Sequence, residues 1–217
     1  MTTKERISLF INELSLIKSN TIRQIVAEQL AEAPEYFFHV PASATGKYHP
    51  SYALGEGGLV RHTKAAVQIA EDLFRAGAAE WYTVYDGGNL YLSPANFQDA
   101  AYAALILHDT YKLGLEDSAT DSSGNPKHTA HDHPLIAAKQ LWSLYRQTSV
   151  QLTVEEQMIW SQAACAIASH MGKWTLSAHS STVLPLPDTW LEHFVHLCDY
   201  LASRKNIEIK LKGANDE

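Results

Sequence analysis

The stretch Ala103-Ala104-Leu105-Ile106-Leu107-His108-Asp109-Thr110-Tyr111-Lys112 places a histidine and an aspartate directly after an apolar run. We predict that Phe97 to Leu107 form a helix that ends at this pair. Adjacent side chains at the end of a helix can approach one metal ion from the same turn. The two oxygens of the Asp109 carboxylate also allow it to reach a second ion as a bridge. Six side chains spread along the chain could then complete a two-metal site: His62, His108, Asp109, His133, His170 and Asp199.

This set of side chains predicts a metal-dependent enzyme. Imidazole nitrogen and carboxylate oxygen suit first-row divalent ions such as manganese, iron, cobalt, nickel and zinc. The only cysteines, Cys165 and Cys198, do not make the cluster of a structural zinc site. We expect both thiols to be small core residues in a reducing cytoplasm. Two metal ions about 3.5–4 Å apart can clamp the attacking and leaving oxygens of a phosphoryl transfer.

The composition is that of an ordinary globular domain. The 217 residues are 46% hydrophobic and 19% charged, which favours one domain with a sizeable core. The net charge of −7 argues against an extended nucleic-acid surface, although a nucleotide or a short oligonucleotide could still bind. The N-terminus lacks the apolar stretch of a signal peptide, and no apolar run is long enough to cross a membrane. The oligomeric state is left open.

The hydrophobic periodicity predicts an all-α fold. Apolar residues recur at three- and four-residue spacing in several segments, which is typical of amphipathic helices. We expect one or two helices in residues 3–33, then helices over 62–75, 97–107, 133–146, 154–170 and 187–205. The domain organisation would be a helical extension and loop (1–50), a metal-binding core (51–205) and a frayed tail (210–217).

Two segments depart from this helical pattern. Residues 81–92 hold two aromatic stretches on either side of Asp86-Gly87-Gly88, which predicts a small β-hairpin inserted between helices. Residues 117–127 are polar and rich in turn formers, which predicts a loop that shapes substrate access. The glycine pairs at 57–58 and 87–88 lack the setting of a nucleotide-binding glycine loop.

The remaining histidines are not among the six candidate metal ligands. A single histidine near a helix end is most often a hydrogen-bonded core or surface group. His131 competes with His133 for one ligand position, and Pro134 favours His133. His179 lies in a serine-rich loop and is either a weak substrate contact or a surface residue. Five others are interpreted as ordinary side chains: His39, His49, His128, His193 and His196.

Five short motifs resemble those of the HD-domain metal-dependent phosphohydrolase superfamily, over about Gly57 to Lys205. A glycine pair precedes the first histidine, and Tyr111 stands where the central motif more often has glycine. The motifs are Gly57-Gly58-Leu59-Val60-Arg61-His62-Thr63, Leu107-His108-Asp109-Thr110-Tyr111-Lys112, His133-Pro134, Ala168-Ser169-His170-Met171-Gly172-Lys173 and Leu197-Cys198-Asp199-Tyr200-Leu201-Ala202. The resemblance implies a helical HD bundle.

Within that superfamily the chain looks most similar to the HD portion of the YhaM-type 3′→5′ exoribonucleases. The segments Ser169-His170-Met171-Gly172 and Val183-Leu184-Pro185 carry this likeness. Those proteins also have an oligonucleotide-binding barrel ahead of the HD domain, whereas the N-terminal segment here looks helical and too short for one. Met171 replaces a second histidine that is common in that family. Processive degradation of RNA is therefore not implied.

The resemblance also implies roles for individual residues. One metal ion would take His62, His108, Asp109 and Asp199, and the second would share Asp109 and take His133 and His170. Lys112 lies one helical turn past His108, where it would neutralise a substrate phosphate, unless it is a solvated lysine. Lys173, Arg61 and His179 are weaker substrate candidates.

The leading hypothesis is a dinuclear metal-dependent phosphohydrolase, a phosphodiesterase or nucleotidase that acts on a nucleotide, a dinucleotide or a short oligonucleotide. Its two ions would be manganese, iron, cobalt or nickel, and Asp109 and Lys112 would be the catalytic residues. The alternative is a mixed-valence diiron oxygenase on the HD fold, because the same ligands serve both. A regulatory nucleotide-binding module without turnover is the third possibility.

Overall fold

Helix α6 (Pro94–Leu107) lies at the centre of the fold and delivers the His108-Asp109 pair. The computed structural model describes residues 1–80, 92–207, 209 and 211. Every residue of α6 from Asp99 to Leu107 is buried, as expected for a helix that is apolar all round. Ser93 caps its start by accepting a hydrogen bond from the Asn96 amide at 3.3 Å, and Pro94 occupies the first helical position.

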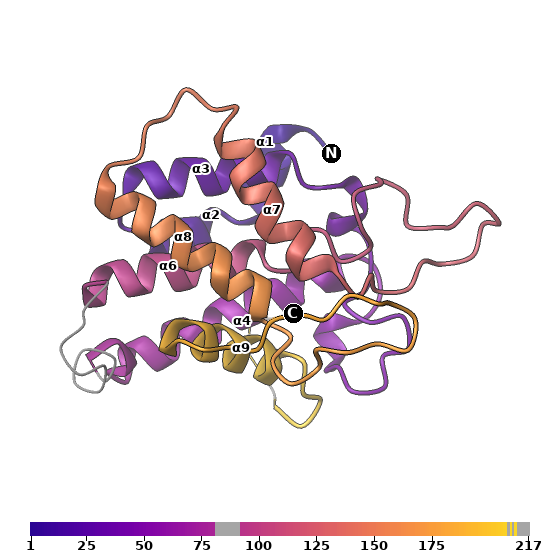
Figure 1. The fold of residues 1–217 in the computed structure, drawn as a ribbon. Coiled ribbons are helices and arrows are strands. Elements are labelled where there is room, and N and C mark those ends of the chain that lie inside the picture. Colours follow the sequence, from indigo (N-terminus) through magenta and orange to yellow (C-terminus); the bar gives the residue numbers. More distant parts are fainter. Residues whose placement is uncertain (81–91, 208, 210, 212–217) are drawn as a thin grey trace.

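Four other helices carry the remaining predicted ligands, and three of them pack against α6 (Figure 1). Helices α4 (Gly58–Arg75), α8 (Val154–Ser169) and α9 (Trp190–Ala202) all pack against it, and α7 (His133–Tyr145) packs on α8. Thr153 and Glu156 form a reciprocal capping box that fixes the start of α8. The ligand-bearing parts of these helices lie close together.

The N-terminal helices belong to the same core. Helices α1 (Thr3–Leu9), α2 (Ile11–Leu16) and α3 (Asn20–Ala31) are followed by two 3-10 helices, η1 (Glu35–Phe38) and η2 (Ser51–Ala53). The Asp99 carboxylate of α6 accepts the amides of Lys18 and Ser19 at 2.7 and 2.8 Å, which joins the turn between α2 and α3 to the central helix. Several apolar side chains of this segment are fully buried in the common core: Phe10, Ile17, Ile22, Ile25 and Leu30.

The prediction of a helical fold is confirmed for the described part of the chain, which contains no β-strand. The first segment breaks into three helices rather than one or two, at Phe10 and again at residues 17–19. Helix α9 begins at Trp190 and not at Pro187, because Thr189 caps it by accepting the Glu192 amide. The hairpin predicted for 81–92 falls, except for Leu92, outside the described residues, and Leu92 itself is buried. Cys198 is buried as expected, but Cys165 is exposed.

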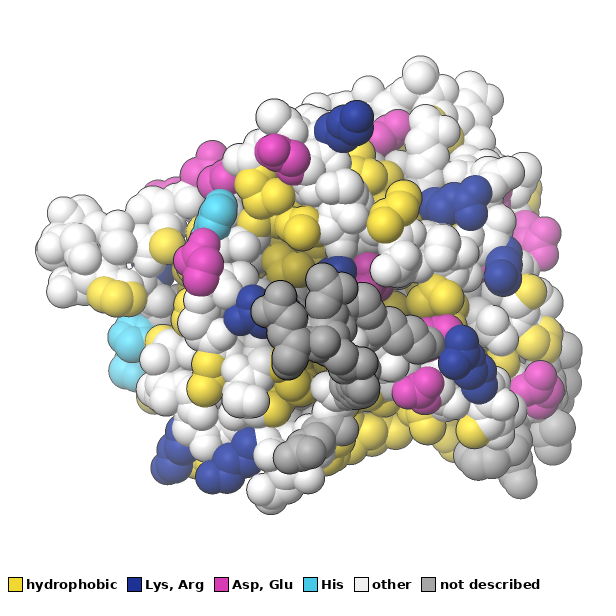
Figure 2. All heavy atoms as spheres, turned by 180° about the vertical axis from the view of Figure 1, so that it is seen from behind, with side chains coloured by type: hydrophobic (Ala, Val, Ile, Leu, Met, Phe, Trp, Pro, Cys, Tyr) yellow, Lys and Arg dark blue, Asp and Glu magenta, His cyan; other side chains and the backbone are white. Residues whose placement is uncertain are grey.

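The surface carries mixed charge. The predicted polar loop 117–127 is non-helical and projects away from the helices in Figure 1. On the face shown in Figure 2, lysine and arginine side chains alternate with aspartate and glutamate and do not gather into one field. No helix of the described residues is long and apolar enough to span a membrane.

Candidate metal centre

The six predicted ligands come from five helices, and each lies within two turns of a helix end. His108 and His170 end α6 and α8, His133 begins α7, and His62 and Asp199 lie on α4 and α9. The backbone brings His62 to this point through two adjacent glycines. Gly57 has a left-handed φ of 66°, and a Cβ at Gly58 would lie 2.3 Å from the carbonyl oxygen of Ala53 in η2.

The side chains form two groups whose candidate ligand atoms lie within 4.8 Å of one another. In the first group, His62 Nε2 and His108 Nε2 lie 2.9 and 3.5 Å from Asp199 Oδ1. The members of the second group are His133, His170 and Asp109. The Nε2 atoms of its two histidines are 3.2 Å apart. Each group could hold a metal ion through nitrogen and oxygen donors.

Asp109 belongs to the second group but also faces the first, with one carboxylate oxygen toward each. Its Oδ1 is 3.1 Å from His133 Nε2 and 3.7 Å from His170 Nε2. Its Oδ2 is 3.5 Å from His108 Nε2 and 3.7 Å from His62 Nε2. This is the placement that a bridging carboxylate requires.

Three of the four imidazoles are oriented by their own helix ends. His108, His133 and His170 each donate Nδ1–H, at 2.7 Å, to the backbone carbonyl three residues earlier. A neutral imidazole that donates through Nδ1 carries its lone pair on Nε2, so all three lone pairs point into the cluster. Such carbonyl bonds are the usual means of fixing metal-binding histidines.

Two buried ligand atoms of the cluster have no described hydrogen-bond partner and could bind a cation instead. His108 Nε2 and Asp109 Oδ1 are buried and have no hydrogen-bond partner among the described residues. His133 Nε2 is close to Asp109 Oδ1, but both atoms are acceptors when the ring donates through Nδ1. Buried polar atoms without partners are rare and cost free energy. A divalent ion in each group would satisfy them, so the residues present fit a metal centre.

The charge of the cluster also suits cations. Burial opposes ionisation of Asp109, but the Lys112 ammonium and His108 hold the pKa of this carboxyl well below its usual range. Burial is likewise outweighed at Asp199, where His108 and His62 lower the pKa. Burial, together with the neighbouring His108 and His133, lowers the pKa of His170 to about 3, which keeps this ring neutral. Two carboxylates and a neutral imidazole therefore face one another at neutral pH.

The predicted substrate residues lie in different places. The Lys112 ammonium is 2.5 Å from Asp109 Oδ2, directly beside the proposed bridge. Arg61 instead donates to the carbonyls of Tyr52 and Leu54, at 2.5 and 2.8 Å. It therefore holds the segment that precedes α4 against this helix. Lys173 and His179 are exposed in the segment after α8, with no described contact to the six ligands. His131 donates to the Thr182 carbonyl and stays out of both groups, which leaves His133 as the ligand candidate.

Two histidines interpreted as ordinary side chains contact the cluster. The His49 ring packs edge-on against His62, with centroids 5.7 Å apart, and its Nδ1 is buried without a hydrogen-bond partner. Burial and the nearby positive groups lower the pKa of His49 to about 4. His196 donates Nδ1–H to the His170 carbonyl at 2.7 Å, and its ring lies where a Cβ on Gly172 would go. No spacing or motif marks His49, whereas His196 shares the helix of Asp199, one turn earlier.

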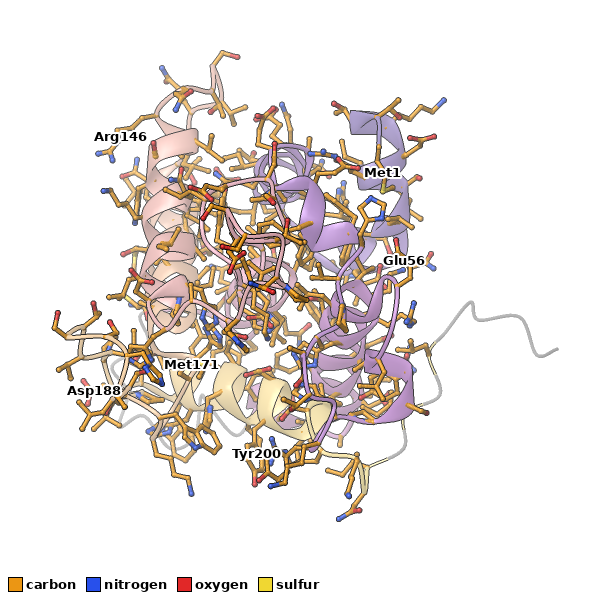
Figure 3. All side chains as sticks on the ribbon, turned by 90° about the vertical axis from the view of Figure 1, so that its right-hand side faces the viewer. Met1, Glu56, Arg146, Met171, Asp188 and Tyr200 are labelled. Atoms are coloured by element: carbon orange, nitrogen blue, oxygen red, sulfur yellow. The ribbon has the colours of Figure 1, made fainter. Side chains whose placement is uncertain are left out.

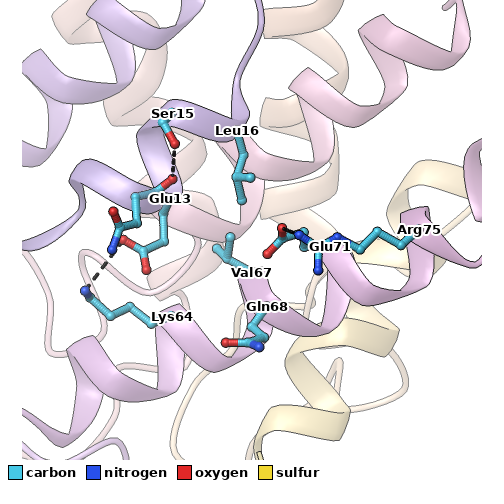
Figure 4. Close-up of a pocket in the computed structure, with 9 residues that line it drawn as sticks. Glu13, Ser15, Leu16, Lys64, Val67, Gln68, Glu71 and Arg75 are labelled. Carbon is cyan, nitrogen blue, oxygen red and sulfur yellow. Dashed lines mark hydrogen bonds and ion pairs between the residues drawn. The ribbon is translucent and has the colours of Figure 1, made fainter. Parts of the chain in front are cut away.

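A separate hollow of about 280 Å³ opens between α2 and α4 (Figure 4). Its charged side chains pair with one another, as in the contacts Lys64–Glu13 at 3.6 Å and Arg75–Glu71 at 2.5 Å. On α4, these residues lie on the face opposite His62. The hollow is therefore not an entrance to the metal centre.

Comparisons with known proteins identify no relative of this chain. The chain matches no protein-family model, no curated protein and no solved structure. The resemblance to the HD-domain superfamily stays a prediction that rests on the five motifs. The chemistry of the centre is accordingly inferred from its own side chains.

Proposed function

We propose that the protein is a dinuclear metal-dependent phosphohydrolase that cleaves a phosphoester bond in a nucleotide, a dinucleotide or a short oligonucleotide. The observation that carries this proposal is Asp109, which presents one oxygen to each of two ligand groups. Two bound divalent ions would supply Lewis-acid activation of water and charge stabilisation at phosphorus. Manganese, iron, cobalt and nickel all suit the mixed nitrogen and oxygen donors.

The side chains of the chain divide the remaining work. Asp109 and Asp199 supply negative charge, and the carbonyl bonds of His108, His133 and His170 hold the rings in place without help from a ligand. The Lys112 ammonium, which is largely buried beside Asp109, brings a positive charge to the position where a phosphate would arrive. Five of the six ligand side chains are buried, so bulk water has little access to them.

Metal analysis coupled to a hydrolysis assay tests this function. We expect about two transition metal ions per chain, because each ligand group holds one, and manganese-dependent turnover of bis-p-nitrophenyl phosphate. Two irons per chain with oxygen consumption and no hydrolysis would replace the proposal with the diiron oxygenase. A protein that binds nucleotide tightly without product in any metal would be a binding module. Absence of bound metal under all conditions would refute the centre itself.

His196 is expected to position His170 from outside the ligand set. The variant His196→Ala removes the bond to the His170 carbonyl and opens space beside Gly172, so we expect metal affinity to fall about tenfold, as for other outer-shell partners. Competition with a fluorescent chelator measures this affinity. His193→Ala, on the exposed side of the same helix, is the matched control and should bind metal like the wild type. Equal affinity in the two variants would remove His196 from the centre.

A further inference from the structure

His62 is the only candidate ligand histidine whose ring no described backbone carbonyl orients. His108, His133 and His170 stand at helix ends, where the carbonyl three residues earlier accepts Nδ1–H. His62 lies inside α4, which continues well beyond it, so the nearby carbonyls accept the amides of the helix itself. Its Nδ1 is buried and has no hydrogen-bond partner among the described residues. When Nε2 binds an ion, the proton of a neutral ring is on Nδ1, and this N–H then needs an acceptor.

The ring of His49 lies next to this unpartnered atom of His62. The two rings pack edge-on, with centroids 5.7 Å apart and planes at 64°. His49 Nδ1 is also buried, and it too has no hydrogen-bond partner in the described part of the chain. Unpartnered polar atoms on two adjacent buried rings are costly unless something joins them. The separation of the rings is within the reach of one water molecule, which would accept from His62 and donate to His49.

The backbone on both sides of His49 is fixed to the end of α9. On one side, the Tyr48 carbonyl accepts the Lys205 amide at 2.8 Å. On the other side, the Tyr52 hydroxyl donates to the Ala202 carbonyl at 2.9 Å. Figure 3 shows the loop that leads into α4 running beside this end of α9. His49 is therefore held in place beside His62 and does not belong to a free loop.

We infer that His49 positions His62, and through it the ion of the first ligand group, by accepting a hydrogen bond from His62 Nδ1–H through one water molecule. This bond does for His62 what the backbone carbonyls do for the other three rings, because it fixes the tautomer and holds Nε2 toward the ion. His49 is a positioning residue and not a ligand, since it belongs to neither ligand group. The inference rests on the metal centre of the proposed function, but not on the reaction catalysed there. The second group does not contain His62, so its ion should not depend on His49.

Competition between the metal-depleted protein and a fluorescent chelator for cobalt(II) tests this role. His49→Phe keeps a flat ring but has no acceptor, so we expect one of the two cobalt sites to weaken about tenfold, as on loss of an outer-shell partner. The other site should be unchanged. His49→Asn places an amide oxygen near the position of Nδ1 and should retain most of the affinity. His49→Leu has the shape of asparagine without an acceptor and should behave like the phenylalanine variant.

Two further variants show whether the effect passes through His62. In a His62→Ala protein, His49→Phe should cause no further loss of cobalt affinity, because the ring that it positions is already absent. His128→Phe is the matched control, since His128 is exposed and lies outside both ligand groups. Circular dichroism checks that each variant is folded. Wild-type affinity in both His49→Phe and His49→Leu, equal losses in His49→Leu and His49→Asn, or a further tenfold loss in the His62→Ala protein would each overturn the role of His49.

The failure of this inference can be told apart from the failure of the proposed function. A protein that binds two cobalt ions and weakens one site on loss of the His49 acceptor, but hydrolyses no phosphoester, would lose the function and keep the inference. A protein that hydrolyses bis-p-nitrophenyl phosphate, and whose His49→Phe variant binds cobalt like the wild type, would do the reverse.

Discussion

Replacing Asp109 with asparagine is expected to abolish metal-dependent hydrolysis and to reduce the metal content of the purified protein. Asparagine has nearly the same volume, but it has one oxygen and no charge, so it cannot present an anionic oxygen to each ligand group. The fall in turnover should be on the order of a thousandfold or more, because the bridge acts as a unit with both ions. Hydrolysis of bis-p-nitrophenyl phosphate and metal analysis on the same preparation measure the two effects.

Asp72→Asn is the control for this substitution. It makes the same change in charge on α4, at an exposed position away from the ligands, and should leave both metal content and turnover unchanged. The Asp109→Asn protein should still be helical by circular dichroism, because α6 is held by apolar packing on all sides. An Asp109→Asn protein that is folded and hydrolyses at the wild-type rate would rule out the bridging role.

The second large effect is expected on stability, at Gly58. A Cβ there would lie 2.3 Å from the oxygen and 2.7 Å from the carbon of the Ala53 carbonyl, and backbone atoms cannot rotate away as a side chain can. We expect Gly58→Ala to lower the free energy of unfolding by about 3 kcal/mol, the upper range for overpacking. Because α4 carries His62, any shift that relieves the clash should also weaken metal binding. Urea denaturation and metal titration measure the two changes.

Gly55→Ala gives the comparison. Gly55 has a φ of 67° and nothing within 4 Å of an added Cβ, so alanine there meets only the cost of the left-handed conformation, about 1 kcal/mol. Gly58→Ala should be clearly the less stable of the two. If both variants unfold at the same urea concentration, then the close approach of α4 to η2 does not determine the stability of this region.

Much of the candidate centre could be predicted from sequence because its ligands have local markers. A glycine pair marks His62, the end of an apolar helix marks His108 and Asp109, and a following proline separates His133 from His131. Each marker reflects a helix end, which is a local property that short stretches of sequence encode. The structure brings these residues together, although nothing in their spacing states which of them share a group.

The parts that the sequence did not reveal depend on the path of the chain in three dimensions. His49 lies in an irregular stretch without periodicity, in the segment between η1 and α4. Gly57 and Leu59 close this segment by donating to the carbonyls of His39 and Val40, and His49 packs on His62 within it. The packing of the N-terminal helices on α6 depends on Asp99, whose carboxylate accepts amides about 80 residues earlier in the chain. The prediction for Cys165 was wrong because its nearest neighbours in sequence, from Ala163 to Ala168, are apolar, whereas in the helix it shares the solvent-facing side with Ser161 and Gln162, four and three residues earlier.

The carbonyl bonds of His108, His133 and His170 have a further consequence for how the centre is assembled. Each ring is oriented by a hydrogen bond to the backbone carbonyl three residues earlier. Its orientation is therefore fixed as soon as that helix end forms. An arriving ion would then have little side-chain rotamer entropy left to remove. The protein would fold first and bind its metal ions afterwards. One ion could then exchange for another without a change in the positions of the ligands.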